Sequence, residues 1–195
     1  MADILTAEQR HRNMSRIRSR DTIPEKKLRS LLFRKGYRFR LYDKRLPGTP
    51  DIVLKKYLTV IFVHGCFWHR HTGCRFSTTP ASNAAFWEKK FAGNTERDRK
   101  KETQLVSQGW HVIIVWECQI RFHPNETLRI ITSFLQGITC NSECGIFDLS
   151  DTGIDSLPAE RGQNGKSRFR RTSHPQQRCP TIISPPVSPN RGTFT

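Results

Sequence analysis

Residues 58–74 read LTVIFVHGCFWHRHTGC, and this stretch decides the predicted fold. Its first part, from Leu58 to His64, is a run of β-branched and apolar residues with the length of one strand. Such a run predicts a buried strand. A loop rich in histidine, cysteine and aromatic residues follows it directly. The stretch therefore predicts a strand with chemically reactive side chains at its end.

Helices and strands are predicted on both sides of this stretch. Thr6 with Gln9 matches the capping-box pattern that opens a helix, here expected to run to about residue 18. Thr22 with Glu25 repeats the pattern, and Gly36 ends that second helix. The remaining expected elements are strands at residues 37–42, 51–54 and 110–116 and helices at 83–91, 95–107 and 125–135. This order favours the α/β fold class, with a mixed β-sheet flanked by helices.

The composition changes near residue 140. All four tryptophans precede that point, whereas most of the eleven prolines follow it. We therefore expect a basic N-terminal helix or arm at residues 1–20, a folded domain at 21–140 and a disordered tail at 141–195. The alternative for the tail is a small docked strand or helix around residues 145–149.

The charge points to a polyanionic partner. Thirty-three Lys and Arg residues stand against 17 Asp and Glu, a net charge of +16. This favours nucleic acid over an anionic membrane or an acidic protein. The sequence shows neither a membrane span nor a signal-peptide pattern, so we expect a cytosolic protein. Its six cysteines are then expected to be reduced, bound to metal or incidental.

The loop after the central strand contains potential metal ligands. Cys66, His71 and Cys74 offer the sulfur and nitrogen atoms that zinc prefers, and Cys118 is the best fourth ligand because it follows a predicted strand. The alternative is that the cysteines are small buried apolar residues. Four protein ligands predict a structural zinc site.

Other side chains suggest hydrolysis of a phosphodiester. His69 is available as a general base, and Asp98 could orient it, although a surface histidine near phosphates is the alternative. Asp51 opens a predicted strand and His64 ends the next. A carboxylate there suits Mg²⁺, to which Glu25 could add an oxygen, but Asp51 could equally be a turn residue.

Adjacent large aromatic residues suggest wedges that open a base stack. Phe67 and Trp68 cannot both point into one core, and apolar wedges of this kind kink DNA. Trp87 could join them, with core packing as the alternative. On the basic first helix, a second set could approach from the opposite groove: Met14 and Ile17, among arginines that include Arg16 and Arg20.

Several motifs together resemble the very-short-patch mismatch repair endonucleases over residues 8–136. The matching pieces are Asn13-Met14, Arg20-Asp21-Thr22, Pro47-Gly48-x-Pro50-Asp51, Phe62-x-His64-Gly65-Cys66-Phe67-Trp68-His69, Phe86-Trp87, Asn94-x-x-Arg97-Asp98 and Trp110-x-Val112-x-x-Val115-Trp116-Glu117-Cys118. The resemblance implies a restriction-endonuclease-like fold that uses Mg²⁺ and a structural Zn²⁺. It also implies nicking of one strand 5′ to the thymine of a T·G mismatch, the product of 5-methylcytosine deamination.

The resemblance also implies a role for each matching residue. Asp51 and the backbone carbonyl of Val63 would bind Mg²⁺. His69 with Asp98 would activate water, and His64 would assist at the phosphate. Glu25 would act through a water on the metal. Zinc would fall on Cys66, His71, Cys74 and Cys118, and the DNA contacts would fall on Phe67, Trp68, Trp87, Met14, Ile17, Arg16 and Arg20.

This sequence departs from the pattern at two points. Residue 63 is valine where a hydroxyl side chain often stands, and the loop at residues 70–74 is longer than in some relatives. We expect a monomer that acts on duplex DNA with a T·G mismatch and contacts mismatch-repair proteins. The alternatives are a zinc-containing module that binds mismatched DNA without cutting it, and a general nuclease of the same fold such as a junction resolvase.

Overall fold

The computed structural model describes residues 18–138 and 144–159, together with Thr6, Glu8, Gln9, Arg12 and Ser15. Of these five isolated residues, Glu8, Gln9, Arg12 and Ser15 are helical. The Thr6 hydroxyl accepts from the Gln9 amide at 3.2 Å, and the Gln9 side chain accepts from the Thr6 amide at 2.9 Å, as predicted for a capping box. Met14, Arg16 and Ile17, proposed above as DNA contacts, lie outside the described residues.

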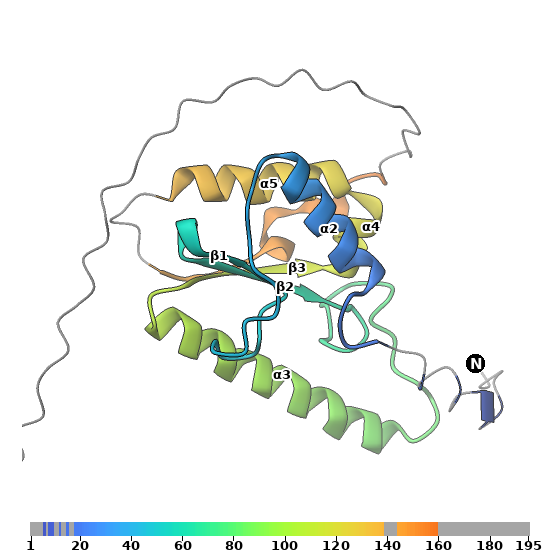
Figure 1. The fold of residues 1–195 in the computed structure, drawn as a ribbon. Coiled ribbons are helices and arrows are strands. Elements are labelled where there is room, and N and C mark those ends of the chain that lie inside the picture. Colours follow the sequence, from blue (N-terminus) through green and yellow to red (C-terminus); the bar gives the residue numbers. More distant parts are fainter. Residues whose placement is uncertain are drawn as a thin grey trace, which may run out of the picture. The chain divides into compact units, whose positions relative to one another are not determined.

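A four-stranded mixed sheet with the order β1-β2-β3-β4 organises the fold (Figure 1). The strands are β1 (Ile52–Leu54), β2 (Thr59–His64), β3 (His111–Trp116) and β4 (Ile146–Asp148). β1 is antiparallel to β2, whereas β2, β3 and β4 run parallel. The register pairs His64 with Trp116, so the ends of β2 and β3 lie together at one edge of the sheet.

Helices cover both faces of the sheet (Figure 1). One face carries α2 (Ile23–Arg34), α4 (Glu117–Phe122) and α5 (Pro124–Gly137), and the other carries α3 (Ala84–Ser107). Along β2, Ile61 joins the apolar cluster under α2 and α5, while Val60 and Phe62 join the cluster with Leu105 of α3. This alternation explains why a strand buried on both faces reads as a continuous apolar run. The predicted α/β class is confirmed, and the architecture is consistent with a restriction-endonuclease-like fold.

Two predictions of secondary structure are wrong. Residues 37–42 form one isolated bridge, Arg40 with Val53, instead of a strand, and Tyr42 takes a left-handed φ of 50° that ends the extended course. The helices predicted at 83–91 and 95–107 are one helix. The Thr95 hydroxyl bonds back to the Phe91 carbonyl at 3.1 Å, so it is satisfied inside the helix and does not cap a new one.

The predicted boundary at residue 140 is also wrong for residues 144–159. β4 pairs with β3, two short 3₁₀ helices follow at Leu149–Thr152 and Ile154–Ser156, and Leu149 and Ile154 are buried. Phe147 stacks on Phe134 of α5 with ring centroids 4.8 Å apart. A few apolar residues suffice to dock this segment, although the average composition of the tail hides them.

Candidate active site

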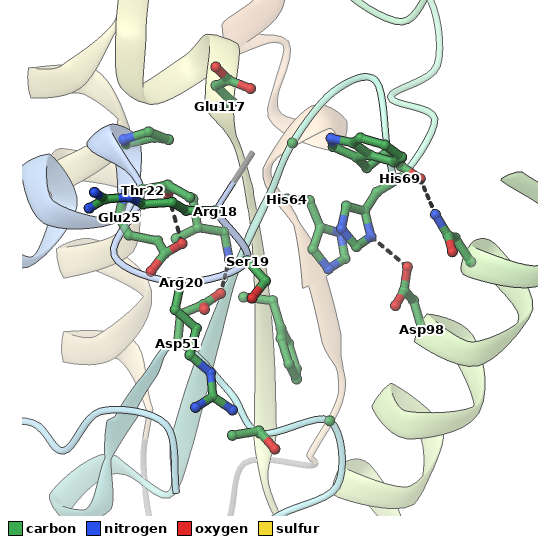
Figure 2. A pocket seen from close by; sticks show the side chains of 18 of the residues that line it. Arg18, Ser19, Arg20, Thr22, Glu25, Asp51, His64, His69, Asp98 and Glu117 are labelled. Carbon is green, nitrogen blue, oxygen red and sulfur yellow. Dashed lines mark hydrogen bonds and ion pairs between the residues drawn. The ribbon is translucent and has the colours of Figure 1, made fainter. Parts of the chain in front are cut away.

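A cleft of about 1190 Å³ opens at the edge of the sheet where β2 ends. The start of α2, the turn before β1, the end of β2 and one side of α3 line it. Figure 2 shows Asp51 and Glu25 on one side of the cleft and the pair His69–Asp98 on the other. The structure therefore brings together the five residues for which catalytic roles were predicted, His64 being the fifth.

Asp51 precedes β1 and is held by the neighbouring strand. The antiparallel register of β1 and β2 continues to place Asp51 opposite Phe62, and the backbone N–H of the next residue, Val63, donates to Asp51 Oδ2 at 2.8 Å. Burial raises the pKa of Asp51 to about 6, with Glu25 adding to the effect, while the Val63 N–H, Arg29 and His69 oppose it. The carboxylate is thus unfavourably charged in the free protein, as expected of a site that receives a cation.

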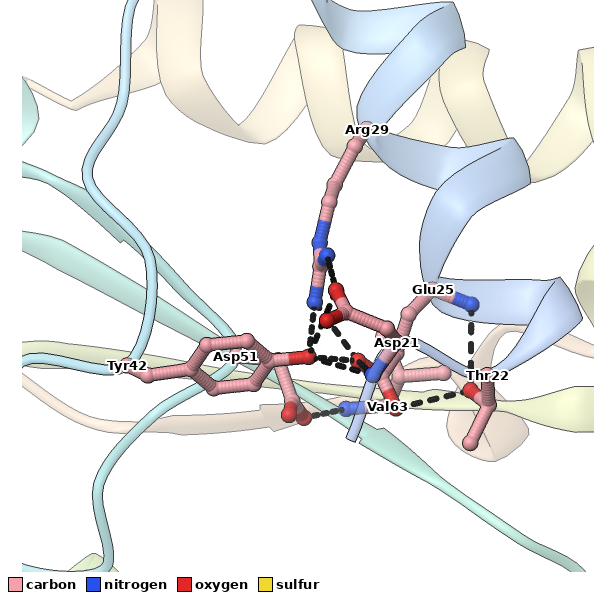
Figure 3. A network of polar contacts seen from close by, with 7 residues as sticks. All are labelled: Asp21, Thr22, Glu25, Arg29, Tyr42, Asp51 and Val63. Atoms are coloured by element: carbon pink, nitrogen blue, oxygen red, sulfur yellow. Dashed lines mark hydrogen bonds and ion pairs between the residues drawn. The ribbon is translucent and has the colours of Figure 1, made fainter. Parts of the chain in front are cut away.

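Glu25 is the centre of a polar network at the start of α2 (Figure 3). Its Oε1 accepts from the Thr22 hydroxyl at 2.7 Å, and its Oε2 accepts from Arg29 Nη2 at 2.6 Å and from the Asp21 amide at 3.0 Å. The Tyr42 hydroxyl contacts both Glu25 and Arg29. These partners satisfy a carboxylate that is only 3% exposed, and they fix its direction beside Asp51.

His64 and His69 form a stacked pair beside Asp98. Their ring centroids lie 4.0 Å apart with 7° between the planes, and His69 Nδ1 lies 2.6 Å from Asp98 Oδ2. Burial lowers the pKa of His64 to about 3, with His69 adding to the effect and Asp98 opposing it, so His64 is neutral. Burial raises the pKa of Asp98, but its hydrogen bond with His69 and the nearby cations outweigh burial and leave that pKa lowered.

This trio could hold a metal by composition, because its ligand atoms all lie within 4.8 Å of one another. The geometry favours acid–base chemistry instead. His69 Nδ1 is already engaged by Asp98, and the lone pairs of two stacked rings run side by side in parallel planes without converging on one ion. The Nδ1 contact leaves Nε2 of His69 as the nitrogen available to a reacting group.

The loop after β2 and the start of α4 bring together a cluster of potential metal ligands: Cys66, His71, Cys74 and Cys118. Their ligand atoms all lie within 4.8 Å of one another, and His71 Nδ1 lies 3.3 Å from Cys118 Sγ and 3.8 Å from Cys66 Sγ. A tetrahedron of Zn–S bonds has sulfur atoms roughly 3.8 Å apart, so the cluster has the size that zinc requires. The hydrogen bond from Cys118 lowers the pKa of Cys66, while the same contact raises the pKa of Cys118 and burial raises that of Cys74, so in the absence of a cation the cluster favours a single thiolate.

The predicted wedge residues form an aromatic cluster next to the cleft. Phe67 meets Trp68 and Trp87 with ring centroids 5.1 Å and 5.4 Å apart, and Phe91 lies below them. Phe91 is buried, whereas Phe67, Trp68 and Trp87 are partly exposed. In the described part of the N-terminal arm, the Arg20 guanidinium lies over the Tyr42 ring at 5.1 Å and also lines the cleft.

Sequence reasoning missed several residues that support the site. Arg29 and Tyr42 fix Glu25, and Tyr42 lay in a segment interpreted as a strand. The Asn94 amide donates to the Trp68 carbonyl at 3.0 Å and so ties the loop to α3. Trp116 stacks on His71 at 4.2 Å and meets His64 edge-on at 5.4 Å, so it separates the two clusters. Asn94 and Trp116 carried a signal, because both belong to motifs of the resemblance, whereas Arg29 and Tyr42 carried none.

Comparison with known proteins places these features in a family. A family model described as DNA mismatch endonuclease Vsr matches residues 2–75. The chain is 50% identical over 120 residues to the type II nicking enzyme V.XorIIP of Xanthomonas oryzae pv. oryzae, covering 62% of this chain and 88% of that protein. It is 44% identical over 140 residues to the DNA mismatch endonuclease Vsr of Escherichia coli K12, covering 72% and 89%. The chain therefore belongs to the Vsr family of DNA mismatch endonucleases.

Proposed function

We propose that this endonuclease nicks one strand of duplex DNA 5′ to the thymine of a T·G mismatch and depends on Mg²⁺. The observation that carries the proposal is the meeting of Asp51 and the His69–Asp98 pair in one cleft, next to an aromatic cluster. The first two are the parts that hydrolysis of a phosphodiester needs. The aromatic cluster is the part that recognition of an unstable base pair needs.

The oxygen atoms at the sheet edge fit Mg²⁺. This hard cation takes carboxylate and carbonyl oxygens, which Asp51 and the backbone of Val63 would supply. The raised pKa of Asp51 fits the same assignment, since a bound cation would offset the cost of burying the carboxylate. When bound, Mg²⁺ supplies positive charge that neutralises the charge developing on the phosphate.

His69 is proposed to take the proton from the attacking water. Its Nδ1 donates to Asp98, which fixes the tautomer and leaves Nε2 free to accept a proton. The carboxylate of Asp98 also stabilises the imidazolium that results. His64 stacks on His69 and holds its ring in one plane, and as a neutral side chain it adds no charge that would oppose protonation of His69.

Glu25 is proposed to order water near Asp51. Oε1 of Glu25 accepts from the Thr22 hydroxyl, and a carboxylate oxygen accepts more than one hydrogen bond, so it can also accept one from a water. Arg29 balances its charge, which allows a second carboxylate to remain beside Asp51.

We propose that Cys66, His71, Cys74 and Cys118 hold a structural Zn²⁺. All four tetrahedral positions are then filled by protein, so the ion holds the loop that carries Phe67 and His69. Phe67, Trp68 and Trp87 are proposed to enter the base stack from one groove, with Arg20 at the phosphates. For Met14, Arg16 and Ile17, the proposed approach from the other groove rests on the sequence pattern alone.

One assay tests the proposal. The protein is incubated with Mg²⁺ and one of four DNA substrates: a duplex with a T·G mismatch, a T·A pair or a C·G pair, or a four-way junction. Each labelled strand is analysed separately. A nick 5′ to the mismatched thymine, lost when Mg²⁺ is withheld, is the expected result. Tight binding of the mismatch without cleavage would favour a non-cleaving binding module, and cleavage of the junction alone would favour a resolvase.

A further inference from the structure

The His71 ring has two nitrogen atoms in different surroundings. Nδ1 faces the sulfur atoms of Cys118 and Cys66. Nε2 faces the other way and lies 3.3 Å from Oδ2 of Asp155. Among the described residues, this buried Nε2 has no hydrogen-bond partner of normal geometry, which leaves the carboxylate as the group to which its proton can point.

Asp155 is held in place by the segment that follows β4. It sits in the 3₁₀ helix Ile154–Ser156, and the neighbouring Ile154 is buried. Gln119 of α4 donates its side-chain N–H to Asp155 Oδ2 at 3.1 Å, while its own Oε1 accepts from the backbone of Trp116 at 3.1 Å. The direction of the carboxylate is therefore fixed by the helix that also carries Cys118.

The same segment fixes the ring that covers His71. Trp116 lies flat on His71 with 6° between the planes, and its indole N–H donates to Asp148 Oδ1 at 2.8 Å. Two carboxylates of one segment thus reach the metal cluster, Asp148 through Trp116 and Asp155 by facing His71.

We propose that Asp155 positions His71 as a zinc ligand by accepting a hydrogen bond from its Nε2–H, and this inference rests on the zinc site of the proposed function. A proton on Nε2 leaves Nδ1 with the lone pair that a metal needs, and a carboxylate acceptor makes that nitrogen a stronger ligand. Without the acceptor, a buried N–H would lose its partner.

The charge of Asp155 acts in the opposite direction on a second neighbour. The Cys118 thiol donates to Asp155 Oδ1 at 3.7 Å, and once Cys118 binds zinc as a thiolate this contact would become a repulsion between two negative charges. The hydrogen bond to His71 and the negative charge are therefore separable effects. The substitution D155N keeps a side-chain carbonyl that accepts from Nε2–H and removes the charge, whereas D155A removes both.

The experiment measures zinc affinity in full-length wild type, D155A, D155N and D151A. Asp151 is an exposed carboxylate of the preceding 3₁₀ helix, so D151A is the matched control. Zinc is titrated against a chelator of known affinity, and Co²⁺ replaces zinc in a parallel series to record the absorption of the ligand field. We expect D155A to bind zinc about 10- to 100-fold more weakly with an altered Co²⁺ spectrum. D155N should stay close to wild type, and D151A should not differ from it.

Three results would overturn the proposal. D155A could bind zinc as tightly as wild type, or D155A and D151A could weaken zinc equally, which would indicate loss of docking and not of one hydrogen bond. Wild type without stoichiometric zinc would overturn this inference and the zinc site together. A protein that fails to nick T·G duplexes but shows the expected zinc series would contradict only the proposed reaction.

Discussion

Replacing Asp51 by asparagine is expected to stabilise the protein while it abolishes nicking. The wild-type carboxyl has a pKa of about 6 in the folded protein, mainly because it is buried, against 3.8 for the ordinary group. Between these values the folded protein holds a proton that the unfolded chain has released. Rising pH therefore destabilises the folded state, and the loss of unfolding free energy reaches its full value above about pH 6.

The difference between the two pKa values sets the magnitude. Ionisation of the Asp51 carboxyl should lower the unfolding free energy of wild type by about 3 kcal/mol at pH 8 and by about 1.6 kcal/mol at pH 5. D51N does not titrate, and its side-chain carbonyl can still accept from the Val63 N–H. Its unfolding free energy should exceed that of wild type by these amounts, which corresponds to a midpoint roughly 6–12 °C higher at pH 8.

Urea denaturation followed by tryptophan fluorescence, at pH 5 and pH 8 without added Mg²⁺, measures this difference. Asp43 is a control of opposite sign, because its hydrogen bond with Arg45 lowers the pKa of Asp43, so D43N should not be stabilised at pH 8. Adding Mg²⁺ should raise the stability of wild type and leave D51N unchanged. The reasoning is refuted if D51N is no more stable than wild type at pH 8, or if its advantage is the same at both pH values.

Three further predictions concern the base, the wedge and the docked segment. H69A should nick about 10²- to 10⁴-fold more slowly in single-turnover assays and still bind the mismatch; an unaffected rate would exclude His69 as the base. W87A should weaken T·G binding by about 1–3 kcal/mol in titrations, whereas F86A, at an exposed neighbour (61%), should not; equal effects would argue against a specific wedge. A chain ending at residue 143 should lose zinc and thermal stability relative to one ending at residue 159, and equal melting temperatures would contradict the role given to β4.

Sequence reasoning predicted the elements with strong local signals. The buried run at β2, the capped start of α2 and the β-branched residues of β3 were read correctly because each signal lies within one element. The docking of residues 144–159 depends on pairing with the free edge of β3, so the sequence offered a docked strand around residues 145–149 only as the alternative. Composition averaged over the whole tail favoured the wrong answer.

In the candidate site, too, residues with a local sequence signal were predicted more readily than residues placed by tertiary packing. The ligand types at Cys66, His71 and Cys74 crowd into one loop, so spacing indicated a metal cluster, and the structure brings Cys118 to it. Of the partners that set direction, Asp98 was predicted beside His69, but Tyr42 and Asp155 were not. Tyr42 reaches Glu25, and Asp155 reaches His71, only because of packing between distant segments. Clustered cysteine and histidine residues can be recognised in the sequence, whereas a single tyrosine or aspartate that orients one of them looks like any other polar residue.

The uninterrupted course of α3 fixes the relative placement of two residues that lie far apart in the cleft region. Trp87 and Asp98 lie eleven positions apart on this helix, which is about three turns and roughly 16 Å, so both project from nearly the same side. Trp87 meets Phe67 and Asp98 meets His69, two residues further along the same loop. If Trp87 enters the base stack and His69 activates the attacking water as proposed, the unbroken helix fixes the distance between these two positions. Inserting one residue between them would turn one end of the helix by about 100° relative to the other, so Trp87 and Asp98 would no longer project from the same side.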